Sequence, residues 1–332
     1  MSDRKPAPHG WLILDKPRGL GSTQAVSAVK RVLRQGGYAK TKVGHGGTLD
    51  PLAEGVLPIA LGEATKLAGR MLDSDKIYEF TVQFGAETDT LDTEGQVTER
   101  SDRRPPMAAI AAVLEHFTGE IDQVPPAYSA VRIDGKRAYD RARAGEEVEM
   151  KTRRVTIHSL TTGIGARTEP LYSTFATTAT RPDPEIGYEP LELAESITLT
   201  AHVSKGTYIR SLARDIARAL GTLGHVTYLR RIKAGPFREE QAISLDKLEE
   251  IAKGAAIENL LLPLEAGLDD IPALQLDPDS AQAVRQGRVL SGLPHTDGLY
   301  FAKLEKTPVA LMELSGGMAM VVRGFNLPDV AE

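Results

Sequence analysis

The segment of this chain best suited to chemistry is a glycine-rich stretch built around Asp50. Residues 44–58 read Gly-His-Gly-Gly-Thr-Leu-Asp-Pro-Leu-Ala-Glu-Gly-Val-Leu-Pro. Glycines let a backbone approach a ligand closely, and a proline after the aspartate restricts the chain there, so Asp50 could be held in a fixed position. This makes Asp50 a candidate catalytic carboxylate. A purely structural turn would have a similar composition, and the pattern alone leaves both interpretations open.

Arg210 is the second residue whose position is unusual. It falls in the first turn of a predicted helix, where the helix dipole disfavours a cation, and at the edge of the apolar face. Arg214 and Arg218 of the same helix point progressively toward water. A half-buried cation normally has an anionic partner. The alternative is an arginine whose stem lies over the core while its charge stays in water.

Several other chemistries are not supported by the sequence. It contains no phosphate-binding Gly-x-x-x-x-Gly-Lys-Ser/Thr loop and no Gly-x-Gly-x-x-Gly between a strand and a helix. His45 has no partner at metal-ligand spacing. The acidic run from Glu87 to Glu94 lacks the spacing of a calcium loop, and we interpret it as a solvated turn. We therefore expect no cofactor and no metal.

The elements that would position these residues follow from hydrophobic periodicity. Alternating or continuous apolar residues predict strands at 10–15, 77–84 and 197–203. Apolar residues at helical spacing predict a helix that Ser22 or Thr23 caps and Gly36 ends, and a second helix over 209–220. Strands and helices are interspersed without a regular βαβ rhythm, which favours an α+β fold with a mixed, mostly antiparallel sheet.

The composition changes twice along the chain. Residues 161–192 are rich in Thr, Pro, Gly and Glu, and we expect a surface insertion there. After about residue 255, short β-like segments such as 299–304 and 318–322 predict a small β-rich domain. We expect a catalytic domain over 1–255 and a C-terminal domain over 256–332.

Charge is distributed unevenly over the 332 residues. The net charge is −5, yet residues 1–49 hold nine Lys/Arg against two Asp/Glu, and residues 204–238 hold eight against one. Such blocks can form a local phosphate-binding face, or they can be solvated helix faces that never meet. The sequence has no cysteine, no signal-peptide pattern and no apolar stretch of membrane-spanning length. We expect a protein of the cytoplasm.

Together these segments resemble the TruB-type tRNA pseudouridine-55 synthases. The stretch from His45 to Leu57 resembles the catalytic motif of that family, and five further motifs follow the family's order over roughly residues 10–240. They are Leu14-Asp-Lys-Pro-Arg-Gly19, Lys76-Ile-Tyr78, Pro125-Pro-Ala-Tyr-Ser-Ala130 with Gly135-Lys-Arg-Ala-Tyr139, Ser204-Lys-Gly-Thr-Tyr-Ile-Arg210 and Tyr228-Leu-Arg-Arg231. Residues 161–192 depart from the family because they are longer and more polar than the usual segment.

The resemblance implies a role for each matching residue. Asp50 matches the essential aspartate, Arg210 the arginine paired with it, and Tyr78 the tyrosine that stacks on the target base. His45 matches a histidine that enters the T-loop. The remaining expected substrate-binding residues are Lys16, Pro17, Tyr208, Leu229, Arg230 and Arg231. The resemblance also implies that the C-terminal domain is PUA-like and binds RNA.

The implied reaction converts uridine to pseudouridine at position 55 in the T-loop of tRNA. The nucleotide must be flipped out of the folded loop, and an ionised Asp50 then either attacks C1′ or removes the 2′ proton. A paired Arg210 favours the ionised form. We expect a monomer that acts on the T-arm of tRNA without an obligatory protein partner. Candidate contacts to the RNA backbone are Lys16, Lys40, Lys42, Arg214, Arg218, Arg230, Arg231 and Lys233.

Three alternatives remain open at this point. The chain could be an RNA-binding protein that keeps the fold without catalysis, although its intact motif argues against this. It could be a related synthase that acts on other RNA within a complex; such relatives usually carry long basic tails, and this chain ends in Asp-Val-Ala-Glu. It could also be a hydrolase of a small phosphorylated substrate, which the lack of metal ligands disfavours.

Overall fold

The computed structural model describes residues 4–129, 131–133, 135–146, 148–162, 168–169, 192–254 and 256–327. The chain forms two compact units, which we describe separately. Unit 1 comprises residues 1–50, 55–73 and 233–332, and unit 2 comprises residues 51–54 and 74–232. This division groups residues by compactness, and the expected domain boundary at residue 255 stays a prediction.

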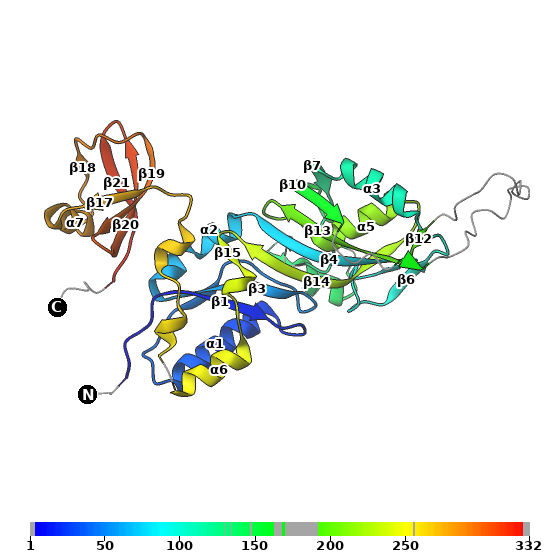
Figure 1. The fold of residues 1–332 in the computed structure, drawn as a ribbon, viewed down its shortest axis with the longest axis horizontal. Coiled ribbons are helices and arrows are strands. Elements are labelled where there is room, and N and C mark those ends of the chain that lie inside the picture. Colours follow the sequence, from blue (N-terminus) through cyan, green and yellow to red (C-terminus); the bar gives the residue numbers. More distant parts are fainter. Residues whose placement is uncertain are drawn as a thin grey trace, which may run out of the picture. The chain divides into compact units, whose positions relative to one another are not determined.

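Unit 1 contains the predicted N-terminal strand, β1, at Gly10–Lys16. It pairs antiparallel with β3, from Gly10 opposite Leu61 to Lys16 opposite Gly55, and its other edge pairs parallel with β16. Helices α1 and α6 lie side by side (Figure 1). The remaining bounds are β2 Val43–His45, β3 Glu54–Leu61, β16 Ile243–Ser244, α1 Ser22–Gln35, α2 Ala68–Asp73 and α6 Leu245–Gly254.

Helix α1 confirms the predicted apolar face and its end at Gly36, but its N-cap differs from the prediction. The cap is Gly21, whose backbone N–H donates to Gln24 Oε1 at 2.8 Å. We expected Ser22 or Thr23 to cap the helix. Ser22 instead lies inside the helix and is buried, because its hydroxyl binds the backbone of another segment.

The C-terminal part of unit 1 confirms the predicted β-rich segment. Its sheet has the order β17-β19-β20-β21-β18. Helix α7 packs against it, and Asp277 caps that helix by accepting the Ser280 N–H at 2.8 Å. The bounds are β17 Ala273–Leu276, α7 Pro278–Arg285, β18 Leu290–Ser291, β19 Gly298–Leu304, β20 Thr307–Ser315 and β21 Met318–Gly324.

Unit 2 is built on a sheet with the order β14-β4-β13-β10-β7. Strand β4 confirms the predicted alternation, since Phe80, Val82 and Phe84 are buried. Helices α3 and α5 pack against each other and against strands of this sheet (Figure 1). The bounds are β4 Lys76–Phe84, α3 Met107–His116, β7 Gly119–Gln123, β10 Arg153–Thr162, β13 Ser196–Val203, α5 Ile209–Ala219 and β14 Gly224–Ala234.

Shorter elements complete unit 2. A hairpin of β5 and β6 encloses the acidic run, with Ala86 opposite Arg100. The expected insertion at 161–192 lies outside the described residues at 163–167 and 170–191. The bounds are β5 Ala86–Thr88, β6 Val97–Arg100, β8 Arg132–Ile133, β9 Lys136–Arg137, α4 Ala138–Arg143, β11 Thr168–Glu169 and β12 Leu193–Ala194.

These elements confirm the predicted α+β class with a mixed, mostly antiparallel sheet and a β-rich C-terminal part. Among the described residues, no helix is long and apolar enough to cross a membrane.

Candidate active site

The segment that carries Asp50 connects β2 to β3. These strands pair antiparallel, with Val43 opposite Leu61 and His45 opposite Ile59. At the start of the segment the Gly46 N–H donates to the Pro58 carbonyl at 2.8 Å. The two strands therefore fix the base of the loop that the sequence identified.

Ser22 fixes the residue directly before Asp50. The Leu49 N–H donates to Ser22 Oγ at 2.7 Å, and the Ser22 hydroxyl donates back to the Leu49 carbonyl at 2.8 Å. Both side chains are buried. Because both backbone groups of Leu49 are bound by one side chain of α1, the backbone leading into the half-buried Asp50 has little freedom.

Two glycines of this loop are required by its geometry. A Cβ on Gly46 would lie 2.5 Å from the Met71 Cβ, and Gly47 has a φ of 144°. A side chain is excluded at the first position by packing and disfavoured at the second by backbone strain. The Gly47 N–H also faces His45 Nδ1 at 3.4 Å.

Lys16 is fully buried rather than exposed to solvent. Its ammonium donates to the Pro17 carbonyl at 3.0 Å and to the Leu20 carbonyl at 2.5 Å, and so supports the turn after β1. Arg231 of β14 is also buried, with 1% of its surface exposed. Both cations are therefore buried in the protein without RNA, and their expected contacts with the substrate stay a prediction.

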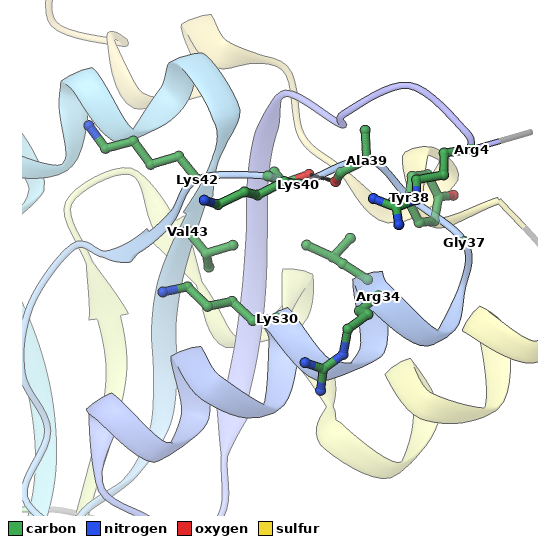
Figure 2. A pocket seen from close by; sticks show the side chains of 11 residues that line it. Arg4, Lys30, Arg34, Gly37, Tyr38, Ala39, Lys40, Lys42 and Val43 are labelled. Atoms are coloured by element: carbon green, nitrogen blue, oxygen red, sulfur yellow. Dashed lines mark hydrogen bonds between the residues drawn. The ribbon is translucent and has the colours of Figure 1, made fainter. Parts of the chain in front are cut away.

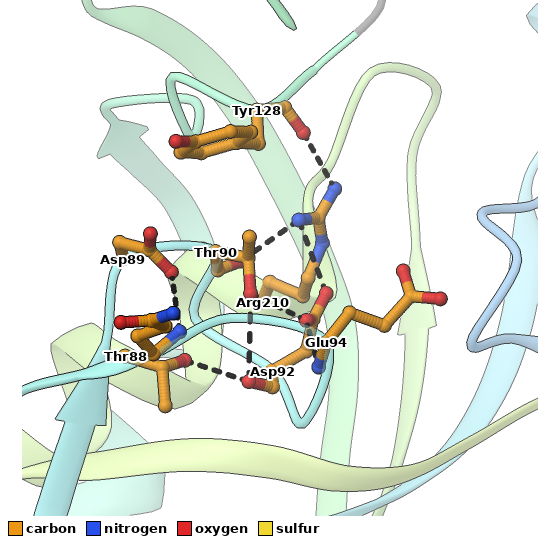
Figure 3. A network of polar contacts seen from close by, with 8 residues as sticks. Thr88, Asp89, Thr90, Asp92, Glu94, Tyr128 and Arg210 are labelled. Atoms are coloured by element: carbon orange, nitrogen blue, oxygen red, sulfur yellow. Dashed lines mark hydrogen bonds and ion pairs between the residues drawn. The ribbon is translucent and has the colours of Figure 1, made fainter. Parts of the chain in front are cut away.

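In unit 2, the structure supports one of the two interpretations of Arg210 that the sequence left open, a buried cation with an anionic partner. Its side chain is 5% exposed, and Nη1 lies 3.2 Å from Oδ2 of Asp92 (Figure 3). The same Nη1 donates to the Thr90 carbonyl at 2.8 Å, and Nη2 donates to the Tyr128 carbonyl at 3.0 Å. The guanidinium thus joins α5 to the acidic loop and to the Pro125–Ala130 motif. Pairing of Arg210 with Asp50 stays a prediction.

Asp92 corrects our interpretation of the acidic run as a solvated turn. Its side chain is 1% exposed. Oδ1 accepts the Thr90 hydroxyl at 2.6 Å and the Glu94 N–H at 2.9 Å, so the carboxylate organises its own loop (Figure 3). Leu91 beside it has a φ of 64°, a conformation that a non-glycine residue adopts only when the surroundings demand it. The sequence analysis did not identify Asp92 as a buried residue.

Tyr78 and Tyr208 lie at the ends of unit-2 elements. Tyr78 continues the buried face of β4 but remains half-exposed, opposite Ala201 of β13. Tyr208 is the N-cap of α5, and the fully buried Gln123 side chain binds both its N–H, at 2.8 Å, and its carbonyl, at 3.1 Å. Gln123 was not identified from the sequence, because a single amide at the end of a strand gives no motif signal.

The motif Tyr228-Leu-Arg-Arg231 lies on β14. Leu229 is buried, and Arg230 Nη1 lies 3.4 Å from Glu54 Oε1. Burial, followed by the negative charges of Glu79 and Glu54, raises the pKa of Tyr228 to about 12. Tyr228 therefore stays a neutral hydrogen-bonding group at physiological pH.

A basic pocket of about 820 Å³ lies in unit 1, between α1 and the segment that follows it (Figure 2). Five of its lining residues are cations and none is acidic; they are Arg4, Lys30, Arg34, Lys40 and Lys42. Five of the nine basic residues of positions 1–49 thus gather on one concave surface. Such a surface suits a polyanion.

The cations of α5 are compensated within unit 2. Arg214 Nε lies 2.8 Å from Asp215 Oδ1, and Arg218 Nη2 lies 2.7 Å from Glu87 Oε1. A ligand phosphate would have to compete with these carboxylates, which makes the pocket in unit 1 the better-suited phosphate surface.

Comparison with known families gives two matches. The TruB family pseudouridylate synthase N-terminal domain matches residues 30–180. The tRNA pseudouridylate synthase B C-terminal domain matches residues 210–269. The chain also resembles a chain of a solved Cbf5–Nop10–Gar1 complex, with a TM-score of 0.67 and 25% identity over 96% of this chain and 85% of that one.

Relatives named tRNA pseudouridine synthase B are similar over almost the whole length. The one from Novosphingobium aromaticivorans is 65% identical over 323 residues, which are 97% of this chain and 99% of the relative. The one from Zymomonas mobilis is 56% identical over 318 residues, which are 96% of each. This chain therefore belongs to the TruB family of tRNA pseudouridine synthases, which are isomerases.

Proposed function

We propose that this chain converts the uridine at position 55, in the T-loop of tRNA, to pseudouridine, with Asp50 as the catalytic carboxylate. The observation that carries the proposal is the restrained loop around Asp50. Its neighbour Leu49 is bound on both backbone groups by Ser22, and Gly46 and Gly47 allow no ordinary side chain. A carboxylate that must reach one atom of a substrate benefits from such restraint.

The reaction is an exchange of bonds within one nucleotide. The N1–C1′ bond breaks, the uracil turns, and a C5–C1′ bond forms while N1 gains a proton and C5 loses one. Asp50 serves either as the nucleophile at C1′, forming an ester bond that breaks when C5 bonds to C1′, or as the base that takes the 2′ proton and returns it to C2′ when C5 bonds to C1′. Both routes need an ionised carboxylate, and neither involves net oxidation, so we propose no cofactor.

We propose that Arg210 supports the ionised Asp50 while Asp92 holds the guanidinium in place. A guanidinium has five N–H donors and can serve two carboxylates and the Thr90 and Tyr128 carbonyls at once. Tyr78 would stack on the extruded uracil, since a half-exposed aromatic ring at a strand end offers a face to a flipped base. We assign His45, Pro17, Tyr208 and Leu229 to the surroundings of that base.

The backbone of the RNA would contact exposed cations. We propose the basic pocket, including Lys40 and Lys42, as the main phosphate surface, because its lining residues carry five cations and no acid. Arg230 and Lys233 are additional candidates. Lys16 and Arg231 stay proposed substrate-binding residues within the site, and both are buried in the protein without RNA. A monomer in the cytoplasm that needs no protein partner remains part of this proposal.

The experiment maps the modified nucleotide. Unmodified tRNA transcripts are incubated with the protein, treated with a carbodiimide that marks pseudouridine, and read by primer extension at single-nucleotide resolution. We expect one new stop, at position 55, and none with a transcript that carries cytidine there. Modification elsewhere, or only of other RNAs, would contradict the assignment of substrate and position.

The same assay separates catalysis from binding. Asp50→Asn keeps the size of the side chain and removes its charge, so we expect no stop at position 55 while binding of the transcript, measured by filter retention, falls less than about tenfold. Binding without modification by the wild type itself would identify a non-catalytic RNA-binding protein.

A further inference from the structure

Two histidines and an aspartate, none of which is assigned a role in the reaction, converge on the surface of unit 2. His158 Nε2 lies 3.1 Å and His202 Nε2 lies 3.8 Å from the same oxygen, Asp75 Oδ2. One ligand atom from each residue lies within 4.8 Å of the other two. No motif of the sequence points to this cluster, because Asp75 and His158 precede His202 by 127 and 44 positions.

The sheet brings these residues together by a local irregularity. Strands β10 and β13 pair with Ile157 opposite Val203, and the register then shifts so that Ser159 lies opposite His202. His158 is therefore the extra residue of a β-bulge, a feature that re-aims a side chain. Its ring lies against the His202 ring, with centroids 4.7 Å apart. Asp75 directly precedes β4, which pairs with β13 on the other side.

We propose that His158, His202 and Asp75 bind a divalent transition-metal ion of the zinc class. Zinc binds imidazole nitrogen at about 2.0–2.1 Å and carboxylate oxygen at about 2.0–2.2 Å in tetrahedral geometry, which places ligand atoms about 3.4 Å apart. The observed separations of 3.1 and 3.8 Å lie on either side of that value. Small rotations of the side chains would bring all three atoms to one ion.

The donor set selects the class of metal. Imidazole suits zinc and its neighbours, whereas magnesium and calcium prefer sites made of oxygen. The three side chains are between 34% and 48% exposed, so an ion can enter and a water can fill the fourth position. A bound ion would join β10, β13 and the residue that precedes β4. This site goes beyond the proposed function, since pseudouridine formation as proposed uses no metal.

A simple ion pair is the competing explanation for the same geometry. In that case at least one imidazole is protonated to pair with Asp75, whereas metal binding requires the neutral ring. The ion pair predicts no selective affinity for zinc at pH 7.5. The metal site predicts one tight equivalent of zinc at pH 7.5 that is lost as the pH falls through the range in which imidazoles protonate.

The experiment uses the full chain without an affinity tag, stripped with a chelator and dialysed. Zinc is titrated by calorimetry at pH 7.5, and bound metal is counted by mass spectrometry. Cobalt is then used as a spectroscopic probe, because a tetrahedral site gives an intense visible absorption. We expect about one equivalent of zinc. His158→Gln and Asp75→Asn should each weaken it at least about tenfold, since losing even an outer partner of a metal ligand costs about 10- to 100-fold.

The matched control is His116→Gln, which removes an exposed histidine at the end of α3 in the same unit. It should leave zinc affinity unchanged. Because Asp75→Asn keeps the shape of the side chain, unchanged thermal unfolding without metal would show that its loss of zinc is a ligand effect. Wild-type protein with no tight equivalent, or equal zinc affinity in wild type and His158→Gln, would overturn the proposal.

Discussion

Replacing Arg210 by methionine tests whether its buried ion pair with Asp92 holds unit 2 together. Methionine keeps the aliphatic stem and removes the guanidinium. The two side chains are 5% and 1% exposed, so Asp92 would be left charged and buried. Removing one partner of a buried pair costs about 3–5 kcal/mol. The Thr90 and Tyr128 carbonyls also lose their donor, and we therefore expect the upper half of that range.

The matched control is Arg218→Met on the same helix. Arg218 also has a carboxylate partner, Glu87, but its side chain is 54% exposed. Exposed ion pairs contribute about 0–1 kcal/mol, so this variant should unfold at nearly the wild-type urea concentration.

Urea unfolding followed by far-ultraviolet circular dichroism measures the free energy of unfolding of each variant. Hydrogen exchange over residues 86–100 shows whether the acidic loop is the segment that is destabilised. A double-mutant cycle with Asp92→Asn should give a coupling energy of about 1–3 kcal/mol. The reasoning is refuted if Arg210→Met lowers the free energy of unfolding no more than Arg218→Met does. It is also refuted if the effects of Arg210→Met and Asp92→Asn on that free energy simply add. In that case Arg210 would act at the substrate without holding the acidic loop.

Three further predictions concern the loop, the pocket and a tyrosine. Gly46→Ala places a Cβ 2.5 Å from that of Met71, so it should cost about 1–3 kcal/mol in urea unfolding and lower turnover, because the loop that carries the catalytic carboxylate must shift. Lys40→Gln with Lys42→Gln should reduce the slope of log affinity against log salt for tRNA by about 1 to 2. The pKa of Tyr228 is raised from 10.0 to about 12, so its contribution to stability is complete below pH 10 and is lost as the pH rises to 12. In urea unfolding, Tyr228→Phe should therefore lose less stability than the wild type between these two pH values.

Each of these has an outcome that would count against it. Wild-type unfolding and turnover of Gly46→Ala would mean that the loop tolerates a side chain. An equal change of salt slope in the control Lys247→Gln with Lys253→Gln, which removes two exposed lysines of α6, would show that only net charge matters. Identical alkaline profiles of wild type and Tyr228→Phe would remove the tyrosine from the explanation.

Elements with a clear period were predictable from the sequence. The helix at 209–219 and the strand at 76–84 have one apolar face each, and burial of that face dominates their free energy, so periodicity alone locates them. Strand β14 was missed because its buried positions, Val226, Leu229 and Arg231, do not alternate regularly. An arginine at a buried position cannot be inferred from hydrophobicity.

In the candidate site, too, the sequence located locally unusual residues but not the polar contacts between distant ones. Asp50 and Arg210 were identified because a glycine-rich loop and a cation in a first helical turn are locally unusual. Asp92 and Ser22 were misread because local rules make an acidic run a solvated turn and a serine a helix cap. In each case a partner far along the chain determines where the side chain lies: Arg210 binds Asp92, and the backbone of Leu49 binds Ser22.

The most direct test of the central claim is release of tritium from tRNA labelled at uracil C5, because forming the C5–C1′ bond expels that hydrogen to water. Wild-type protein, Asp50→Asn and a surface control, Asp279→Asn, are compared at saturating tRNA. We predict release by the wild type and the control and none by Asp50→Asn, with tRNA affinity within about tenfold. Release by Asp50→Asn at a rate near that of the wild type would contradict the role of Asp50 as the catalytic carboxylate.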